Sequence, residues 1–508
     1  MSESPLVIAV DSSTTSTKAI IVDSAGEVLG EGRADVVMST PRVDFYEQDP
    51  REWWSTTNTA IGEAIASLTD QDKARVTHAC CTIQRQSFAL VDEAGEPLRP
   101  GILWLDGRAA EQVRRLGNES LHILSGFQPD VTPSFYKIAW LKDHEPEVLQ
   151  KATKVVGVHA YLVHAMTCKW VDSRGAADSL GLFDMSQQEW SDTLLDLAGL
   201  RRDQVCDLVD PGEVIGPINA EITRAWGLEQ EISLVAACGD GQAAALGAGA
   251  IGPDEAYLNM GTALVAGVHS PTYEHAGVFR TDAAGLPGQY VLEIVQNSGA
   301  YLAGWFREKL GDPNLGGKPD PGLEAKAAEV PAGCGGLVTL PYWNAVQSPH
   351  WDPIAKGAIV GLAGAHDRAV IYRSVLEGIS LEMASNFKGL QATTGVPLTS
   401  VRVVGGGQRS ALWRQIMTDA CGVGLTEVLQ PEVSAMGAAV MAMAAAGAYS
   451  SVEEAAKGMA KLGETSEPDM ATHERYNELA AVQAKVYPAL TEVFEAQYEY
   501  AKKYPLHD

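Results

Sequence analysis

The chain contains one short unit twice: an apolar strand, a small polar turn and a second apolar strand. The first copy is LVIAVDSSTTSTKAIIVD, from residue 6 to residue 23, and the second is YLNMGTALVAGVHS, from residue 257 to residue 270. Alternating apolar residues predict the strands, and the Ser, Thr and Gly residues between them predict the turns. Because a unit that recurs after half the chain indicates a duplication, we predict two lobes that each open in this way.

A second strand that ends in a carboxylate marks the end of the first lobe. ISLVAACGD ends in Asp240 and runs into the small-residue helix GQAAALGAGA, just as LVIAVD ends in Asp11. We place the boundary between the lobes within residues 247–252, which gives lobes of residues 1–248 and 249–508. The length of 508 residues fits two to four domains, each with a sizeable core.

Helices and further strands are predicted between these units. Asp49 is the expected N-cap of a helix, with Pro50 in its first turn and Glu52 closing a capping box. The apolar face of this helix comprises Trp53, Ala60, Ile61, Ala64, Ile65 and Leu68. Strands are predicted over VTHACCTI, FALVD, ILWLD and VRVV, and helices over the segment after VRVVGGGQRS, over SAMGAAVMAMAAAG and over the tail from residue 468.

The charge of the chain excludes one class of partner. Lys and Arg number 38 against 65 Asp and Glu, a formal net charge of −27. A nucleic-acid-binding protein needs a positive surface, so we expect no nucleic-acid partner. An anionic ligand must be met locally, by backbone N–H groups, a metal ion or a well-placed cation.

Cysteine usage and hydropathy indicate the cellular location. The seven cysteines are scattered, without a C-x-x-C pair or zinc-finger spacing, and this pattern is typical of reduced thiols in the cytosol. The first residues contain no signal-peptide pattern, and no apolar run is long enough to span a membrane. We therefore expect a cytoplasmic protein that has no membrane contact. A symmetric homodimer is the expected assembly, because it is the commonest one among soluble proteins.

The turn after the first strand has the composition of a phosphate-binding loop. Ser13, Thr14 and Thr15 offer hydroxyl and backbone N–H donors to phosphate oxygens, and Lys18 adds a cation. Asp11 can hold Mg²⁺ directly or through water. The segment is not a Walker A loop, and a hydroxyl-rich surface turn is the alternative.

Two glycine-rich turns extend this phosphate-binding pattern. Gly261-Thr262 and Gly405-Gly406-Gly407 each follow an apolar strand. A nucleotide that lies across a cleft needs several such close approaches of the backbone, which glycine allows. GGGQRS lacks the G-x-G-x-x-G spacing, so a dinucleotide-binding fold is not supported.

Asp240 is the candidate catalytic base. It ends an apolar strand, and the Gly241 that follows lets a ligand approach the backbone. A carboxylate in this position can accept the proton of a substrate hydroxyl during phosphoryl transfer. The alternative is an N-cap Asp that satisfies helix N–H groups and does nothing else.

A mixture of polar side chains predicts a polyol site. Arg85 and Gln86 follow one strand, and Trp104, Asp106 and Arg108 close the next. Fixed donors and acceptors of this kind suit a polyhydroxyl ligand, whereas a structural salt bridge and a capped strand end are the alternatives. A zinc protease is not supported, because His159 and His164, five residues apart, lie on different faces of a helix.

These segments, in this order, resemble the FGGY family of carbohydrate kinases, and most closely its xylulokinase-like members. The quoted motifs are IAVDSSTTSTKAIIVD, YEQDPREWW, RPGILWLDGR, PSFYKIAWLKDHEPE, WSDTLLDLAGL, ACGDGQAAALGAGAI, LNMGTA, KGAIVGLAGAHDRAVIYRSVLEG and VVGGGQRSALWRQIMTD. The resemblance implies an α/β fold of two lobes of the actin, hexokinase and Hsp70 type, with ATP in the cleft between them. The chain departs from the family at Ser13, where the first phosphate loop usually has Gly, and within the two family signatures at Thr132 and Val370.

The resemblance also implies roles for single residues. Asp240 matches the catalytic base of the family, and Asp11 matches the aspartate at its Mg²⁺-phosphate site. The residues expected to bind ATP are Ser13, Thr14, Thr15, Lys18, Gly261, Thr262, Gly405, Gly406, Gly407 and Gln408. Those expected to bind the substrate are Arg85, Gln86, Ser87, Trp104, Asp106, Asp240 and Gln242.

The substrate itself stays open between a small ketose and a polyol. Xylulokinases carry Gln-Met-His-Gly where this chain has QRQS, residues 84–87, and glycerol kinases carry Asn-Gln-Arg-Glu-Thr there. Arg85 and Gln242 resemble the glycerol kinase pattern. D-xylulose is the best single expectation, glycerol or a tetritol is the alternative, and a catalytically silent sugar- or nucleotide-binding regulator is the alternative of another class.

Overall fold

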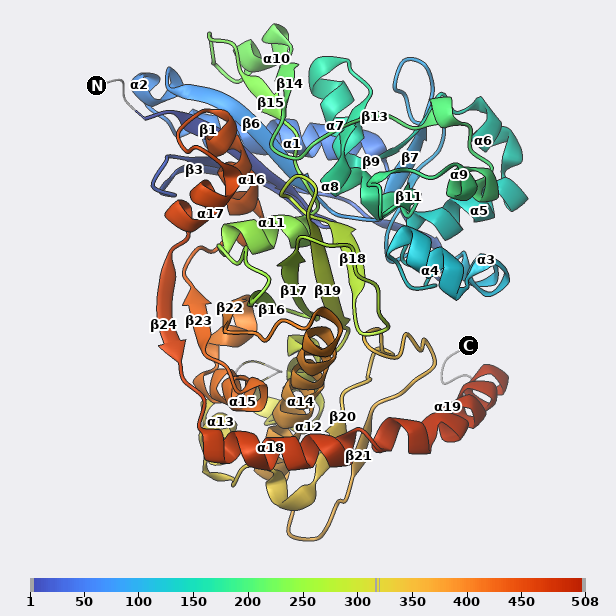
Figure 1. Cartoon of the computed structure of the whole chain (residues 1–508), viewed down its shortest axis with the longest axis vertical. Coiled ribbons are helices and arrows are strands. Elements are labelled where there is room, and N and C mark those ends of the chain that lie inside the picture. Colours follow the sequence, from blue (N-terminus) through green and yellow to red (C-terminus); the bar gives the residue numbers. More distant parts are fainter. Residues whose placement is uncertain (1–3, 316–317, 319, 505–508) are drawn as a thin grey trace.

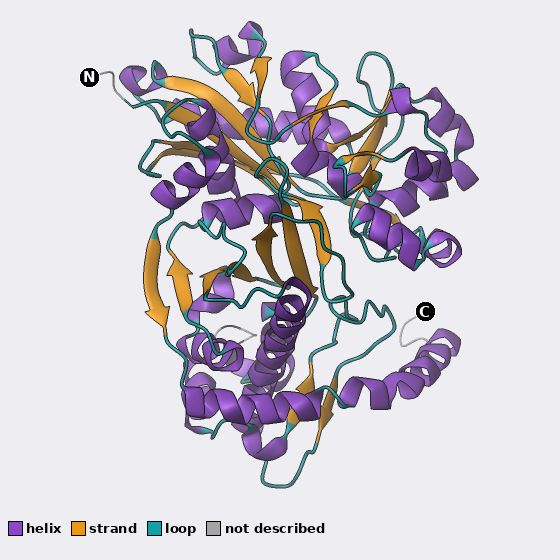
Figure 2. Ribbon diagram, viewed as in Figure 1, coloured by secondary structure: helices purple, strands orange, loops and turns teal. Residues whose placement is uncertain are grey.

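The computed structural model describes residues 4–315, 318 and 320–504. Figure 1 shows most of the first half of the chain above most of the second, with α16 (Val433–Ala445) and α17 (Val452–Met459) of the second half lying against the first sheet. Each half is built around one large mixed sheet with helices on its faces (Figure 2). The first sheet has the strand order β14-β15-β6-β1-β2-β3, and the second has the order β18-β19-β17-β16-β22-β23-β24. An α/β fold with two lobes is therefore present.

The strands of the first sheet are β1 (Leu6–Ser12), β2 (Ser16–Val22), β3 (Val28–Asp35), β6 (Val76–Ile83), β14 (Val214–Pro217) and β15 (Ser233–Val235). Those of the second are β16 (Glu255–Met260), β17 (Leu264–Ser270), β18 (Arg280–Ala283), β19 (Tyr290–Gln296), β22 (Ser400–Val404), β23 (Leu425–Val428) and β24 (Leu462–Ser466). A third sheet contains β4 (Ser39–Arg42), β5 (Phe45–Gln48), β7 (Phe88–Val91), β8 (Gly101–Ile102) and β9 (Lys154–Gly157). Short pairs are β10 (Val171–Ser173) with β13 (Asp207–Val209), β11 (Phe183–Asp184) with β12 (Glu189–Trp190), and β20 (Val338–Leu340) with β21 (Ala358–Val360).

The helices of the first half are α1 (Pro50–Ala66), α2 (Asp70–Lys73), α3 (Ala110–Leu116), α4 (Glu119–Ser125), α5 (Ser134–His144), α6 (Pro146–Lys151), α7 (Val158–Thr167), α8 (Arg174–Ala177), α9 (Asp192–Ala198), α10 (Ala220–Ala225) and α11 (Asp240–Gly247). Those of the second half are α12 (Ala300–Leu310), α13 (Pro321–Glu329), α14 (Arg368–Thr394), α15 (Ala411–Cys421), α16 (Val433–Ala445), α17 (Val452–Met459), α18 (Met470–Gln483) and α19 (Val486–Lys503). None of the helices in the described ranges is long and apolar enough to cross a membrane.

The predicted repeat of strand, turn and strand is confirmed in the pairing of the two large sheets. β1 pairs antiparallel with β2 and parallel with β6, and β16 pairs antiparallel with β17 and parallel with β22. The repeated turns therefore occupy equivalent places, each at the end of the first strand of its sheet. The lobe boundary between residues 248 and 249 stays a prediction.

Three local predictions need correction. ILWLD forms a strand only at Gly101–Ile102, because Asp106 accepts hydrogen bonds from the N–H groups of Tyr46 and Arg108 and turns the chain. ISLVAACGD forms a strand only over Ser233–Val235. The expected capping box at α1 is incomplete, since Glu52 accepts from the N–H of Val37 rather than from that of Asp49.

The two halves meet through helices that pack backbone to backbone. A Cβ atom at Gly247 in α11 would lie 2.0 Å from the carbonyl oxygen of Val433, and one at Gly437 in α16 would lie 1.9 Å from that of Ala243. Only glycine fits at such an approach. The small residues of SAMGAAVMAMAAAG therefore let α16, from the second half, rest against α11 and against β1 and β6 of the first sheet.

The first half has a conventional apolar core, and its conspicuous tryptophan and histidine residues belong to it. Trp53 of α1 is fully buried and donates its indole N–H to Gln48, whereas Trp54 is half-buried. His159 pairs with Asp172 and His164 stacks on Trp170, so the two histidines share no ligand site. All seven cysteines are free.

Candidate active site

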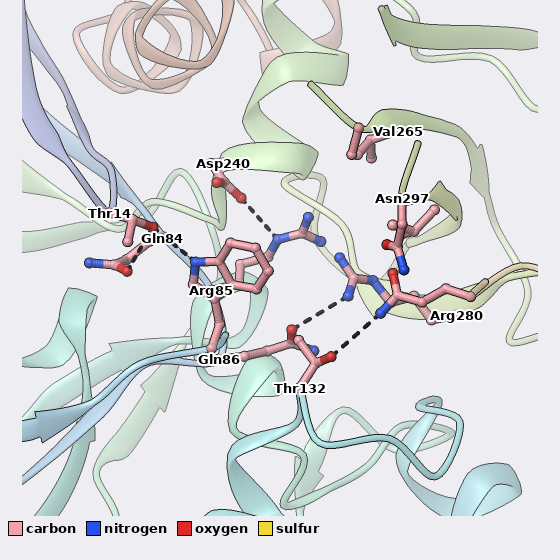
Figure 3. Close-up of a pocket in the computed structure, with 13 residues that line it drawn as sticks. Thr14, Gln84, Arg85, Gln86, Thr132, Asp240, Val265, Arg280 and Asn297 are labelled. Atoms are coloured by element: carbon pink, nitrogen blue, oxygen red, sulfur yellow. Dashed lines mark hydrogen bonds and ion pairs between the residues drawn. The ribbon is translucent and has the colours of Figure 1, made fainter. Parts of the chain in front are cut away.

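A small polar cavity of about 240 Å³ lies where loops of the first half face strands of the second (Figure 3). Four residues predicted to bind the substrate line it, namely Arg85, Gln86, Trp104 and Asp240. The remaining lining residues are Thr14, Gln84, Thr132, Ala263, Val265, Arg280, Val295, Asn297 and Gln347. The cavity therefore draws its wall from both halves of the chain, and most of its polar groups are amides, hydroxyls and guanidinium groups.

Asp240 opens α11 at one side of this cavity. Gly239, not Asp240, is the N-cap of that helix, and Asp240 is its first residue. The Oδ1 atom of Asp240 accepts hydrogen bonds from Nε of Arg85 at 2.9 Å and from its neighbour Gly241 N–H at 2.8 Å. The side chain is 38% exposed, and within the described residues no hydrogen bond engages its Oδ2 atom. A carboxylate with one anchored and one open oxygen can accept a proton from a bound hydroxyl.

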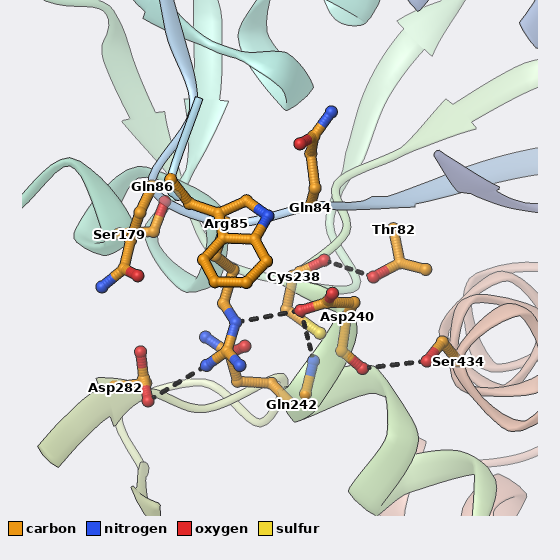
Figure 4. A network of polar contacts seen from close by, with 12 residues as sticks. Thr82, Gln84, Arg85, Gln86, Ser179, Cys238, Asp240, Gln242, Asp282 and Ser434 are labelled. Atoms are coloured by element: carbon orange, nitrogen blue, oxygen red, sulfur yellow. Dashed lines mark hydrogen bonds and ion pairs between the residues drawn. The ribbon is translucent and has the colours of Figure 1, made fainter. Parts of the chain in front are cut away.

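Arg85 is the centre of a buried charge network (Figure 4). Beyond Asp240, its guanidinium contacts Glu293 at 3.0 Å and Asp282 at 3.2 Å. Glu293 also accepts from Nε of Arg280 at 2.8 Å and from the hydroxyl of Tyr257 at 2.8 Å. Arg85 therefore both lines the cavity and forms structural salt bridges, so the two interpretations of this residue are compatible.

The ionisation of this network follows from its burial and its charges. Burial acts to raise the pKa of Glu293, but the guanidinium groups of Arg280 and Arg85 outweigh it and hold that pKa at about 2. Burial raises the pKa of Asp282 to about 6 against the opposing charge of Arg85. Glu293 is thus the firmly ionised partner of the two arginines.

Three residues predicted to bind the substrate lie outside the cavity and bind other protein groups. Ser87 donates to Gln84 and accepts from the N–H of Trp104. Asp106 is fully buried in an ion pair with Arg108. Gln242 donates to the carbonyl oxygens of Gly175 and Ala283. These hydrogen bonds and ion pairs fix the loops behind the cavity, although the Oε1 atom of Gln242 is buried without a hydrogen-bond partner.

The first predicted phosphate loop lies beside the cavity. Thr14 donates its hydroxyl to Gln84 at 3.1 Å and accepts from the indole of Trp104 at 2.9 Å. The hydroxyl of Ser13 closes the turn on the carbonyl oxygen of Ser16, and Thr15 is exposed. Lys18, expected to bind phosphate, is ion-paired with Glu432 of the second half at 2.7 Å.

Asp11 has the properties expected of a cation ligand. Its Oδ1 atom is buried without a hydrogen-bond partner. Burial, together with the negative charge of nearby Asp240, raises its pKa to about 7. A carboxylate oxygen left unpaired in this way fits Mg²⁺, which prefers oxygen ligands and keeps most of its water. The described residues contain no group of three or more His, Cys, Asp or Glu side chains that could hold a metal ion together.

The triple-glycine turn separates two hollows in the second half. Gly406 and Gly407 line one of about 720 Å³ between α12, α13 and α15. Gly405, Gly406 and Gln408 line another, of about 450 Å³, which Glu432 also lines. Gly405 has a φ of +88°, and a Cβ atom there would lie 2.4 Å from the side-chain oxygen of Asn259. The turn therefore requires glycine at 405, and Gly406 lines both hollows.

Gly261 and Thr262, the other predicted phosphate turn, line neither hollow. The carbonyl oxygen of Gly261 accepts from the N–H of Ala300, and that of Thr262 accepts from the N–H of Gly299. These bonds attach the turn between β16 and β17 to the start of α12.

Sequence reasoning missed the cavity residues that come from distant segments. The cavity is also lined by Thr132, Arg280, Asn297 and Gln347. Of these four, the sequence singled out only Thr132, as a departure from a family pattern. The sequence does contain a signal for the charge network, because Glu293 interrupts the otherwise apolar run YVLEIVQ. A carboxylate inside a buried strand needs a partner, and Arg280 stands opposite it on β18.

Comparisons with known proteins cover most of the chain. The model of the N-terminal domain of the FGGY family of carbohydrate kinases matches residues 6–247, and that of the C-terminal domain matches residues 256–446. The xylulose kinase of Escherichia coli strain K12 is 30% identical over 457 residues, covering 88% of this chain and 92% of its own. The glycerol kinase of Bordetella parapertussis is 30% identical over 482 residues, covering 89% of this chain and 91% of its own. The structure of xylulose kinase from Rhodospirillum rubrum superimposes with a TM-score of 0.90 at 28% identity, over 96% of this chain and all of that one.

Proposed function

Because the chain belongs to the FGGY family of carbohydrate kinases, we propose that it transfers the γ-phosphoryl group of ATP to a terminal hydroxyl of D-xylulose. The observation that carries this proposal is the position of Asp240, whose open oxygen borders a small polar cavity next to the predicted phosphate loop. The similarity to xylulose kinases over most of the chain supports the choice of sugar.

Asp240 acts as the general base. Its open oxygen accepts the hydroxyl proton as the O–P bond forms, and in a loose transition state this transfer is late. The Oδ1 atom stays bound to Arg85 and Gly241, so the carboxylate keeps one orientation while it gains the proton. Groups fixed before the reaction need no reorganisation during it, which lowers the barrier.

The nucleotide would lie from the first phosphate loop towards the triple-glycine turn. Asp11 would hold Mg²⁺, and that ion would neutralise charge on the β- and γ-phosphate oxygens. Lys18 would leave Glu432 for a phosphate oxygen, since a phosphate carries more charge than the carboxylate. The backbone at Gly406 and Gly407 borders a hollow large enough for a nucleoside.

The charges around the cavity favour an uncharged substrate. The two guanidinium groups of Arg85 and Arg280 face three carboxylates, those of Asp240, Asp282 and Glu293. Among the described residues that line the cavity, both cations are paired with carboxylates, so a ketose or polyol is preferred over a sugar acid.

A glycerol or tetritol kinase is the second candidate. The cavity is small, Arg85 matches the glycerol kinase pattern, and the Bordetella glycerol kinase is as similar as the E. coli xylulose kinase. A silent regulator is disfavoured because both Asp11 and Asp240 are retained.

The test is ADP release from Mg-ATP with a panel of ketoses, aldoses, polyols and sugar acids. We expect one strong substrate, D-xylulose, and a fall in kcat of at least ~10² in Asp240→Asn with near-normal ATP binding. Asp203→Asn is the matched control, because Asp203 is 73% exposed, is paired only at the surface with Arg201, and does not line the cavity. Wild-type turnover by Asp240→Asn would reject the assignment of the base, and turnover of glycerol alone would select the second candidate.

A further inference from the structure

The base is held in place from the opposite half of the molecule. Arg85 follows β6 of the first sheet, whereas Glu293 lies in β19 of the second. The guanidinium of Arg85 joins them, with Nε on Asp240 at 2.9 Å and Nη2 on Glu293 at 3.1 Å. Three charged groups from separate segments therefore form one continuous chain that ends on the catalytic carboxylate.

We propose that Glu293 is a positioning residue, which orients the carboxylate of Asp240 through the guanidinium of Arg85. This inference rests on the proposed function, in which Asp240 is the base. A guanidinium is planar, so fixing Nη2 also fixes the direction in which Nε–H points. The bond from Nε then holds Oδ1 of Asp240 and leaves Oδ2 to face the cavity.

Glu293 is rigid enough for this task. It is fully buried and stands directly opposite Arg280 in the pairing of β18 with β19. Arg280 donates to its Oε1 atom, and Tyr257 donates to its Oε2 atom at 2.8 Å. A buried carboxylate with several charge-assisted bonds has one orientation, since any rotation leaves donors unsatisfied.

The backbone around the base is shaped to let Arg85 pass. A Cβ atom at Gly239 would lie 2.4 Å from Cδ of Arg85, and one at Gly241 would lie 2.7 Å from its Nη2 and 2.5 Å from Oε2 of Glu293. Glycine on both sides of Asp240 therefore admits the side chain, which runs past the base to the second half. Because a side chain at position 239 or 241 would collide with Arg85, both glycines are needed for the contact between Arg85 and Glu293.

The arrangement makes the alignment of the base depend on both halves. If the second half moves away, Arg85 loses Glu293 and Asp282, and Asp240 is then held by the N–H of Gly241 and by a guanidinium that is itself no longer anchored. Such a dependence would protect ATP from hydrolysis. The base is aligned only when the two halves are together, and in that state water is excluded from the site.

The test compares Glu293→Gln with Glu377→Gln. Glu377 is an equally buried carboxylate that binds Arg373 at 2.8 Å and Tyr476 at 2.9 Å, but it lies on α14 and outside the cavity. Each variant replaces the carboxylate of a buried Arg–Glu–Tyr cluster. We expect Glu293→Gln to lower kcat by roughly 10- to 100-fold, the usual effect of a misplaced catalytic group, with KM for ATP and sugar within about threefold. Glu377→Gln should lose thermal stability to a similar degree and keep its kcat.

Two further variants keep the proposal testable if Glu293→Gln does not fold. Tyr257→Phe removes one donor to Glu293 and should lower kcat by a few-fold, and Glu293→Asp should restore part of the loss. The proposal is overturned if the Glu293 variants that fold keep kcat within about twofold of wild type, whatever their KM. If neither Glu293→Gln nor Glu293→Asp folds, the same limit applies to Tyr257→Phe. Asp240→Asn is assayed alongside, so that a failure of the base assignment is distinguished from a failure of the positioning role alone.

Discussion

The indole N–H of Trp104 donates a hydrogen bond to Oγ1 of Thr14 at 2.9 Å. Trp104 was expected to contact the sugar and Thr14 to contact phosphate, and the two side chains form one wall of the same cavity. Because the phosphoryl group must pass between the two substrates, their sites have to share a boundary. This bond is part of that boundary, with Thr14 also donating to Gln84.

Removing this bond should weaken sugar binding. Trp104→Phe keeps an aromatic ring but loses the donor, so the ring is no longer fixed against Thr14. We expect KM for the sugar to rise by about two- to tenfold, the range of one hydrogen bond, with a smaller change in kcat. Trp54→Phe, on α1 and outside the cavity, is the control for the same truncation. An unchanged KM in Trp104→Phe would mean that the bond does not shape the sugar site.

Asp11 should set the requirement for magnesium. Asp11→Asn keeps the shape of the side chain and removes the charge of its unpaired buried oxygen. We expect the Mg²⁺ concentration for half-maximal rate to rise by roughly 10- to 100-fold and Mg-ADP binding, measured by calorimetry, to weaken in parallel. Asp92→Asn, in an exposed turn that closes on the N–H groups of Ala94 and Glu96, is the control. Equal Mg²⁺ dependence in Asp11→Asn and wild type would place the metal elsewhere.

The buried ammonium of Lys137 should make stability depend on pH. It lies in α5 and donates to the carbonyl oxygens of Thr132 and Trp104, behind the cavity. Burial lowers its pKa from 10.5 to about 7, partly opposed by the charges of Asp106 and Asp130. Between these two pH values the folded protein releases the proton while the unfolded chain keeps it. The contribution of Lys137 to the free energy of unfolding therefore rises with pH across this window, and the cost of burying the charge is fully present below pH 7.

Urea unfolding of wild type and Lys137→Met from pH 6 to pH 9 measures this contribution. All other titrating groups are common to both proteins, so their effects cancel in the difference. We expect the stability of wild type relative to the variant to increase above pH 7, with a slope of at most ~1.4 kcal/mol per pH unit. A difference that stays constant over this range would show that Lys137 keeps its ordinary pKa.

Local sequence patterns determined the elements of the fold because their causes are local. Alternating apolar residues specified β1 and β2, and Asp49-Pro50 specified where α1 begins. The repeat of a strand, a polar turn and a strand predicted two similar sheets. The run ILWLD failed as a strand for a non-local reason, since the N–H of Tyr46 donates a hydrogen bond to Asp106, 60 residues away.

For the site, the sequence determined which residue types follow the strands, and the tertiary structure decided where their side chains point. Asp240, Arg85 and Trp104 reach the cavity, whereas Asp106 and Gln242 bind other protein groups. Both outcomes are compatible with the same local pattern, because the direction of a polar side chain after a strand depends on which distant groups can satisfy it.

The sequence indicates that Glu293 needs a partner, but only the tertiary structure decided that Arg85 is one of its partners. Arg85 and Glu293 are 208 residues apart, and neither the turn after β6 nor the strand β19 contains information about the other. They meet because the two sheets are brought together by the close packing of α11 on α16, which requires glycine at 247 and 437. The sequence by itself therefore determined the chemistry available to this protein, and the packing of its two halves decided which oxygen of Asp240 is free to use it.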